Sequence, residues 1–232
     1  MISAVIFDFD GIIVDSERLH WAAFNKVMAP LGKTISWPDY VQTYIGFDDR
    51  DTFRTAFPNI GNGELSGMIE KKAAAFQGLL ESDGAAALPG SVELIKHLSS
   101  RIPIAICSGA LRADILPILG SLGIENAFDS IVTADDTHIS KPDPAPYRLA
   151  AERLSVAASG GRGIMRRPAA STGAGFMLAI EDTPAGIASA KGAGLKVLAV
   201  TNSYEAEFLT QADAVVASLE SLTLEKLNVL LA

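Results

Sequence analysis

Cysteine and basic charge are what this sequence has least of. Cys107 is the only cysteine among 232 residues, which excludes an intramolecular disulfide and a thiolate zinc cluster. Lysine and arginine together number 19, against 27 aspartates and glutamates, a formal net charge of −8. Nucleic-acid-binding proteins normally carry a basic face, so this balance argues against a nucleic-acid partner. An acidic protein can still bind a phosphate, because a few local donors or a metal ion decide the charge of one site.

Long apolar runs and a secretory signal are also missing. No uncharged apolar run reaches the roughly 18–20 residues that are needed to cross a bilayer. The N-terminal segment meets its first charged side chain at Asp8, and it has neither the basic flank nor the small-residue cleavage site of a signal peptide. We therefore expect a cytoplasmic protein without membrane contact. We expect it to be a monomer, with a dimer as the alternative.

Short apolar runs alternate with helical patterns over most of the chain. The predicted strands lie at 2–7, 103–107, 130–133, 177–180, 196–200 and 214–216. The predicted helices between and after them lie at 91–100, 111–120, 144–155, 185–193, 205–211 and 221–231. Strands that alternate with helices indicate a mostly parallel sheet covered on both faces, which is a Rossmann-like, doubly wound α/β fold.

The stretch from about 16 to 84 interrupts this alternation. Helical patterns begin near Leu19 and return at 37–44, 49–57 and 63–82, without a clear strand. We predict an all-α cap domain at 16–84, inserted into an α/β core domain made of 1–15 and 85–232. A second irregular stretch, 159–175, contains five glycines, three arginines and no acidic residue. We predict a flexible surface loop there, on the side of the sheet away from the active site.

A pair of acidic residues closes the first predicted strand. Asp8 and Asp10 are followed by Gly11, and ligands of open α/β sheets bind at this carboxyl edge. One carboxylate can attack phosphorus or bind a metal, while the other exchanges a proton with the entering or leaving oxygen. Gly11 permits a tight turn that brings backbone amides to the site. An ordinary turn is the alternative, since Asp and Gly are common in turns.

Three further strand ends carry groups that suit a phosphate or a metal. Ser108 and Gly109 offer a hydroxyl and free amides at a helix start, which together can hold an anion. Lys141 could neutralise charge on a phosphoryl group, and Glu181 and Asp182 offer the oxygen ligands that Mg²⁺ prefers. Taken singly, Ser108 is more often a plain helix cap and Lys141 a solvated lysine, while Asp182 could cap a helix and bind a metal in the same turn. Their common position at one edge of the predicted sheet is not expected from independent structural roles.

These segments resemble the haloacid dehalogenase superfamily of phosphotransferases, in the subgroup with a helical cap after the first motif. Within it, the chain is most similar to β-phosphoglucomutase and phosphoglycolate phosphatase relatives. The segments that carry the resemblance are DFDGIIVDSE, ICSGA, KPDPAPY and IEDTPAGIASAKGAGLKVLAV. The resemblance extends from Ile2 to about Val216, and Ile12 departs from the Thr or Val that is usual in the family.

The resemblance implies a role for each core residue. Asp8 would be the nucleophile that forms an aspartyl-phosphate, and Asp10 the general acid and base, with its backbone carbonyl on the metal. Lys141 would hold the nucleophile and the phosphate together electrostatically. The phosphate-binding residues would include Gly11, Ser108 and Gly109, and the Mg²⁺ ligands would be Asp8, Asp10, Glu181 and Asp182.

Four cap residues are candidates for substrate contact. Ser16 and His20 resemble the hinge and first cap helix of the β-phosphoglucomutase group, where His20 could approach Asp10; a histidine packed on the cap is the equal alternative. Arg50 could bind a second phosphate or a sugar oxygen through its planar donor fork, or be an exposed cap arginine. Lys72 is a weaker candidate, because charge runs such as its Glu-Lys-Lys segment are usually solvated faces.

The resemblance implies a Mg²⁺-dependent phosphatase that acts on a small phosphorylated metabolite, such as a sugar phosphate or phosphoglycolate. The nearest alternative is a hexose-phosphate mutase of the β-phosphoglucomutase type, in which the sugar replaces water as the acceptor. A non-catalytic binding module is a third hypothesis. Loss of Asp8 or Asp10 would have favoured that module, and both are present.

Overall fold

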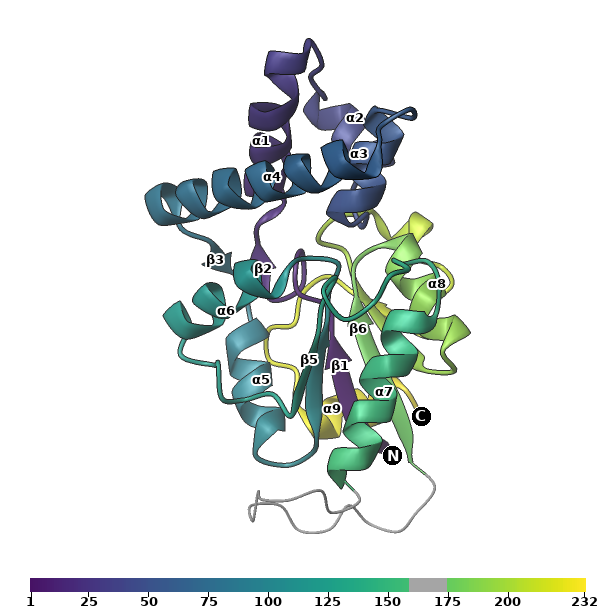
Figure 1. Cartoon of the computed structure of the whole chain (residues 1–232). Helices are drawn as coiled ribbons and strands as arrows, with labels where there is room; N and C mark the ends of the chain where they lie inside the picture. The colour runs from purple at the N-terminus through teal and green to yellow at the C-terminus, as the bar shows by residue number, and fades with distance from the viewer. Residues whose placement is uncertain (159–174) are drawn as a thin grey trace.

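A six-stranded, fully parallel sheet forms the centre of the protein, in a computed structural model that describes residues 1–158 and 175–232. The strand order is β5-β4-β1-β6-β7-β8 (Figure 1). The bounds are β1 Ile2–Phe7, β4 Ile104–Cys107, β5 Ser130–Val132, β6 Phe176–Glu181, β7 Lys196–Val200 and β8 Ala214–Val216. The chain builds one half of the sheet outward from β1 and then returns to build the other. The resulting reversal of strand order beside β1 is where open α/β sheets bind ligands.

Helices cover both faces of the sheet because side chains alternate along the strands. In β1, Val5 and Phe7 enter one apolar core while Ala4 and Ile6 enter the other. The first face packs against α5 (Ser91–Ser99), α6 (Arg112–Ser121) and α9 (Leu224–Leu230), and the second against α7 (Ala145–Ala158) and α8 (Pro184–Gly192). The predicted doubly wound α/β fold is therefore confirmed. Cys107 lies in the second core, where burial raises the pKa of its thiol to about 12.

The predicted helix at 205–211 is wrong. Only a single 3₁₀ turn, η2 (Ala206–Phe208), forms in this segment. Leu209 is buried, but Phe208 is 58% exposed, so the segment has no apolar face that could hold a longer helix against the sheet. The predicted loop at 159–175 lies, apart from Gly175, outside the described residues.

Four helices stand above the carboxyl edge of the sheet (Figure 1). They are α1 (Glu17–Met28), α2 (Trp37–Thr43), α3 (Asp49–Ala56) and α4 (Asn62–Asp83), with a 3₁₀ turn, η1 (Ala29–Leu31), after α1. Their apolar faces meet in a separate core that includes Phe24, Met28 and Phe53. We call these helices the cap and the sheet with its helices the core. A two-stranded antiparallel ribbon, β2 (Val14–Asp15) and β3 (Ala86–Ala87), joins the cap to the core.

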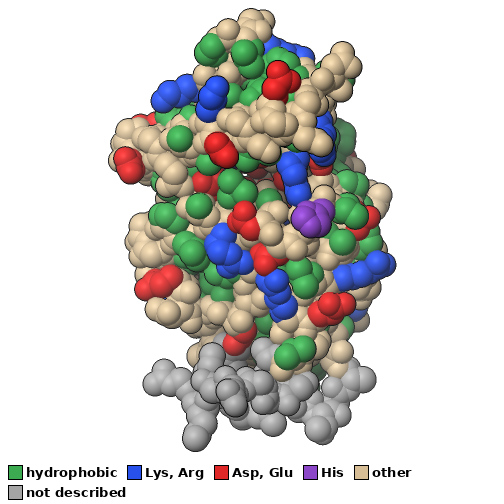
Figure 2. Space-filling model, in the orientation of Figure 1, with side chains coloured by type: hydrophobic (Ala, Val, Ile, Leu, Met, Phe, Trp, Pro, Cys, Tyr) green, Lys and Arg blue, Asp and Glu red, His purple; other side chains and the backbone are tan. Residues whose placement is uncertain are grey.

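Helix composition and the distribution of charged side chains bear on membrane and nucleic-acid contacts. Among the described residues, no helix combines the length and the apolar composition that spanning a bilayer requires. On the face shown in Figure 2, acidic and basic side chains are interspersed over the cap and the core. Among the residues described there, the basic side chains on this face do not form a continuous patch of the kind that binds nucleic acid.

Candidate active site

Asp8, Lys141 and Glu181 meet at the carboxyl edge of the sheet, under the cap. Asp8 directly follows β1, Glu181 ends the neighbouring β6, and Lys141 comes from the loop between β5 and α7. The Lys141 Nζ lies 2.9 Å from Asp8 Oδ1 and 2.7 Å from Glu181 Oε1, and all three residues are buried. Carboxyl ends of parallel strands share one edge, which is why residues so distant in sequence converge.

Burial and crowding shift the ionisation of this group. Burial, followed by the negative charge of Glu181, raises the pKa of Asp8 to about 8, although Lys141 opposes the shift. Burial disfavours the charged form of Lys141, but the carboxylates of Asp8 and Glu181 outweigh it and raise the lysine pKa. Glu181 is fixed further by the Tyr147 hydroxyl, which donates to its Oε1 at 2.8 Å. The lysine is therefore held as a cation between two carboxylates.

A third carboxylate, that of Asp182, completes a set that suits a divalent cation. Asp8, Glu181 and Asp182, which we call the acidic set, each offer an oxygen, and these oxygens lie within 4.8 Å of one another. Ser203 donates to Asp182 Oδ2, whereas Asp182 Oδ1 is buried without a partner among the described residues. Burial and then the charges of Asp8 and Glu181 raise the pKa of Asp182 well above its usual range. Three carboxylates with a single neighbouring lysine leave an excess of negative charge. Together with the unpartnered Asp182 Oδ1, they fit an ion such as Mg²⁺.

The backbone of Gly11 lies very close to the Asp182 side chain of the acidic set. Its φ is +74°, and a Cβ added there would lie 2.0 Å from Asp182 Oδ2. The Asn202 side chain donates to the Gly11 carbonyl at 2.7 Å and holds the turn in place. The glycine thus allows the turn after Asp10 to approach Asp182, which no residue with a side chain could do in this conformation.

Asp10 faces the cap, and its side chain lies outside the acidic set. Ser16 donates to Asp10 Oδ1, His20 Nε2 lies 3.1 Å from the same oxygen, and Ser108 Oγ lies 3.4 Å from Oδ2. Burial alone would raise the pKa of Asp10, but His20 and the Ser16 hydroxyl outweigh it and lower it to about 2. That the Asp10 backbone carbonyl binds the metal remains a prediction.

Lys72 lies behind His20 and is fully buried, so the expectation of a solvated lysine is wrong. Its Nζ is 2.8 Å from His20 Nδ1 and 2.8 Å from Asp49 Oδ1. An ammonium group only donates hydrogen bonds, so His20 Nδ1 accepts and Nε2 carries the hydrogen that faces Asp10. The His20 ring stacks on Phe76 with ring centres 4.2 Å apart. Lys72 on α4 and His20 on α1 therefore support Asp10 in its carboxylate form.

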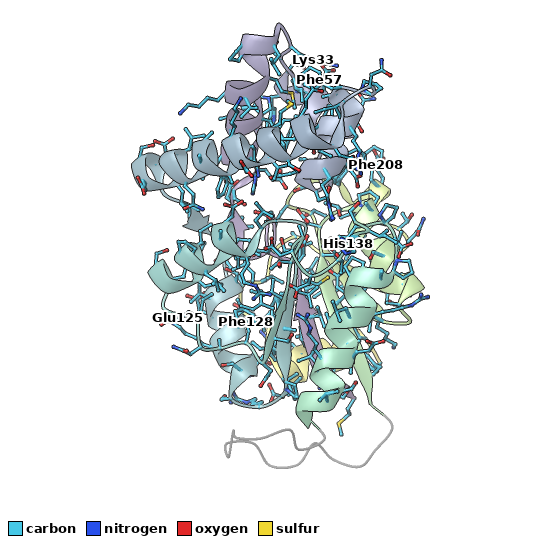
Figure 3. All side chains as sticks on the ribbon, in the orientation of Figure 1. Lys33, Phe57, Glu125, Phe128, His138 and Phe208 are labelled. Atoms are coloured by element: carbon cyan, nitrogen blue, oxygen red, sulfur yellow. The ribbon has the colours of Figure 1, made fainter. Side chains whose placement is uncertain are left out.

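Arg50 lies at the boundary between cap and core. Its Nε donates to Asp48 Oδ2 at 2.7 Å, and its Nη2 donates to the Thr137 carbonyl at 3.0 Å. The Thr137 loop also carries His138, which lies between cap and core in Figure 3. The guanidinium is half-buried, so Arg50 is not the freely exposed arginine of the alternative hypothesis. A Cβ added at Gly109 would lie 3.7 Å from the Cβ of Asp48 across the same boundary.

A small cavity lies between the cap and the core. Its free volume is about 40 Å³, and its core side includes Asp8, Gly109 and Lys141. At about 10–15 Å³ for each water, this is room for only a few water-sized molecules. A larger groove of about 650 Å³ lies at the far end of the cap near Phe57 (Figure 3). That groove has an apolar lining with Glu64 as its only carboxylate among the described residues, so we place the chemistry in the small cavity.

Three lining or supporting residues escaped the sequence analysis. Glu17 lines the cavity from the cap, and its Oε2 accepts a hydrogen bond from the Tyr40 hydroxyl at 2.9 Å. Burial and then the charge of Asp10 raise the pKa of Glu17 to about 7. Its position three residues before His20 on one helix could have revealed it, since such residues share a face. Tyr40 and Asp49, which also line the cavity, gave no comparable signal.

Without a divalent cation, the free energy of unfolding is expected to fall as the pH rises from about 4 to about 8. The pKa of Asp8 is about 8 in the folded protein, against 3.8 for an ordinary aspartate. Between these values the folded protein keeps a proton that the unfolded chain has lost, so raising the pH favours unfolding. The raised pKa values of Glu17 and Asp182 act in the same direction.

Thermal melts in chelator and in Mg²⁺ between pH 5 and pH 8 measure this effect. The stabilisation by Mg²⁺ should grow with pH, because the ion competes with protons for the carboxylates. A melting temperature in chelator that does not change over this range, or a Mg²⁺ effect that is equal at both ends, would contradict the assignment.

Comparisons with known proteins agree with this geometry. Residues 5–200 match the family model of the haloacid dehalogenase-like hydrolases. The chain is 26% identical over 221 residues to validoxylamine A 7'-phosphate phosphatase of Streptomyces hygroscopicus subsp. limoneus, covering 94% of this chain and 95% of the relative. It is 27% identical over 223 residues to a phosphorylated carbohydrates phosphatase of Thermotoga maritima, covering 91% and 92%.

A solved structure shows the same fold. The β-phosphoglucomutase of Clostridium difficile superposes with a TM-score of 0.80 at 26% identity, covering 100% of this chain and 97% of that one. Phosphatases of this family generally use a divalent metal ion, and the acidic set of Asp8, Glu181 and Asp182 provides a place for one. The chain is a phosphoric monoester hydrolase and belongs to the haloacid dehalogenase-like hydrolase family.

Proposed function

We propose that the protein is a Mg²⁺-dependent phosphatase that hydrolyses a small phosphorylated metabolite, of the sugar-phosphate or phosphoglycolate type, through a phosphorylated Asp8. One observation carries the proposal: the Asp8 carboxylate is buried at the end of β1, 2.9 Å from Lys141 and beside the open oxygen of Asp182. The names of the two phosphatase relatives support a substrate of the carbohydrate class.

The first step transfers the phosphoryl group to Asp8. Asp8 has a pKa of about 8 without a metal ion, and it would lose its proton when a divalent cation binds beside it. The Asp8 carboxylate oxygen attacks phosphorus, and the bond between phosphorus and the ester oxygen breaks. The leaving oxygen takes a proton from Asp10. The pKa of that carboxyl is about 2 in the ligand-free site, but the negative charge of a phosphate bound beside it raises the pKa and favours proton delivery. Lys141 offsets the repulsion between the two anions.

The second step returns Asp8 to its starting state. Asp10, now a carboxylate held by Ser16 and His20, takes a proton from water. The water oxygen attacks phosphorus, the bond between phosphorus and the Asp8 oxygen breaks, and inorganic phosphate leaves. The Ser108 hydroxyl donates to Asp10 and accepts from the Ala110 amide at 2.9 Å. Ser108 is therefore positioned to orient the phosphoryl oxygens as well.

Mg²⁺ would be held by Asp8 and Asp182, with Glu181 beside them, where it supplies Lewis-acid neutralisation of the phosphoryl charge. Glu181 already accepts hydrogen bonds from Lys141 and Tyr147, so its main part is to orient the lysine. Phosphoryl transfer depends mostly on such positioning and charge neutralisation.

A panel of phosphorylated metabolites tests the proposal, with phosphate release measured in Mg²⁺ and in chelator. The panel includes phosphoglycolate, pentose monophosphates and bisphosphates, and both anomers of glucose 1-phosphate. We expect release that depends on Mg²⁺ from one small group of compounds. Conversion of β-glucose 1-phosphate to glucose 6-phosphate with a bisphosphate primer, without phosphate release, would show a mutase instead. No reaction in either assay would contradict the proposal.

A further inference from the structure

The cap side of the active-site cavity carries carboxylates and aromatic rings. Its polar side chains are Glu17, His20, Tyr40 and Asp49, and its aromatic rings include Phe24 and Phe47. The core side already contains two carboxylates, Asp8 and Asp10, with Lys141 as the only lysine or arginine that lines the cavity in the described part of the chain. A substrate that places its phosphate beside Lys141 therefore directs its other end toward the carboxylates of Glu17 and Asp49. We call these two residues the acidic wall of the cavity.

Lys72 and Arg50, two cations of the cap, already have hydrogen-bond and ion-pair partners of their own. Lys72 is fully buried and pairs with Asp49 and His20 behind the wall. The donor fork of Arg50 is occupied by Asp48 and by the Thr137 carbonyl. Neither side chain lines this cavity. Arg50 lines a smaller neighbouring pocket together with Ser108 and Lys141, and there its charge is already paired with Asp48.

Asp49 provides an unused acceptor on the same wall. Its Oδ1 pairs with Lys72, while its Oδ2 is buried without a hydrogen-bond partner among the residues described. The residue is 8% exposed and lines the cavity. A buried carboxylate oxygen without a partner is costly, and it accepts a hydrogen bond from a hydroxyl group while repelling another anion.

We propose that the cavity selects phosphate monoesters whose remaining part is uncharged and rich in hydroxyl groups, and that Asp49 and Glu17 exclude substrates with a second phosphate or a carboxylate. The inference rests on the proposed phosphatase function and narrows it. The hydroxyl groups of polyol and sugar monophosphates would donate hydrogen bonds to the unpartnered Asp49 Oδ2. Phosphoglycolate and sugar bisphosphates would place a negative charge against it.

Two matched pairs of compounds test the selection. Glycerol 3-phosphate and 3-phosphoglycerate differ by a hydroxymethyl group against a carboxylate, and fructose 6-phosphate and fructose 1,6-bisphosphate differ by one phosphate. Calorimetric titration of the Asp8→Asn protein in Mg²⁺ at pH 8, where Glu17 with its pKa of about 7 is mostly ionised, measures binding without turnover. We expect the uncharged-end member of each pair to bind roughly 10-fold tighter or more, because a like charge at close range costs at least this factor.

Two substitutions assign the selection to the wall. In Glu17→Gln and Asp49→Asn, each combined with Asp8→Asn, the ratio within each pair should fall at least roughly threefold, because a repulsive charge is removed. Glu70→Gln is the matched control, since it removes the same charge from an exposed position on α4 and should leave the ratio unchanged. Either wall variant is sufficient if the other fails to fold.

The outcomes separate this inference from the proposed function. Three outcomes would each overturn the inference. They are equal or tighter binding of the anionic members, no binding of the neutral members, and binding ratios that Glu17→Gln and Asp49→Asn leave unchanged. Absence of Mg²⁺-dependent phosphate release from p-nitrophenyl phosphate by the wild-type protein would instead count against the phosphatase function, because that measurement does not involve the cap wall.

Discussion

Replacing Asp8 with asparagine is expected to lower turnover by roughly 10⁴-fold or more, in the range seen when a covalent nucleophile is removed. The amide keeps the shape of the side chain but is a poor nucleophile toward phosphorus. The folded protein should not lose stability with it. Asp8 is one of three crowded carboxylates, and burial already raises its pKa to about 8. In chelator at pH 8, the Asp8→Asn protein should therefore melt no lower than the wild type.

The combination of lost turnover and retained stability distinguishes a chemical role from a structural one. Asp83→Asn is a suitable control because it removes one carboxylate at an exposed position at the end of α4, and it should leave both quantities unchanged. Turnover by Asp8→Asn close to that of the wild type would rule out the covalent route.

Replacing Lys141 with methionine is expected to affect both activity and stability. The substitution leaves Asp8 and Glu181 buried without their shared cation, and breaking a buried ion pair in this way costs about 3–5 kcal/mol. Turnover should fall by roughly 10³-fold, the scale of one preorganised electrostatic contact. The loss of stability should be larger at pH 8 than at pH 5, because Asp8 takes up a proton at the lower pH and relieves the repulsion.

Lys191→Met is the matched control for this prediction. Lys191 Nζ lies 2.9 Å from Asp213, but the two side chains are 38% and 28% exposed, and a pair of this kind contributes about 0–1 kcal/mol. Chemical denaturation and steady-state kinetics of the two variants provide the comparison. If Lys141→Met proved as stable or as active as Lys191→Met, the central position of Lys141 would be contradicted.

The core of the candidate site could be predicted from the sequence because its geometry follows from the sheet. Parallel strands place their carboxyl ends at one edge, so side chains that follow different strands converge there. Asp8, Lys141 and Glu181 follow this rule, and the structure brings them within hydrogen-bond distance. The alternation of strands and helices predicted the doubly wound fold for the same reason.

The cap was harder to predict because tertiary contacts decide the environment of each side chain. Lys71 and Lys72 are neighbours in one charge run, yet Lys72 is fully buried since Asp49 and His20 surround its ammonium group. Periodicity places a lysine on a helix but does not show what faces it. Likewise, the sequence suggested Arg50 as a substrate contact, which stays a prediction, but it gave no sign that the guanidinium bonds to Asp48 and to the Thr137 carbonyl.

The ribbon between cap and core illustrates a different limit. β2 and β3 contain two residues each, which is too short for an alternating pattern to be recognised in a sequence. Their pairing depends on the two crossings of the chain between core and cap lying side by side. Such a contact is known only once the whole fold is assembled.

Rapid quenching of the wild-type protein during turnover, followed by mass spectrometry, tests the central claim most directly. With Mg²⁺ and a substrate from the reactive group, we expect a fraction of the protein to carry one phosphoryl group, and fragmentation should place that group on Asp8. The modification should disappear when the substrate is exhausted and should be absent from Asp8→Asn. Steady turnover without a phosphorylated protein, or a phosphoryl group on another residue, would contradict the account.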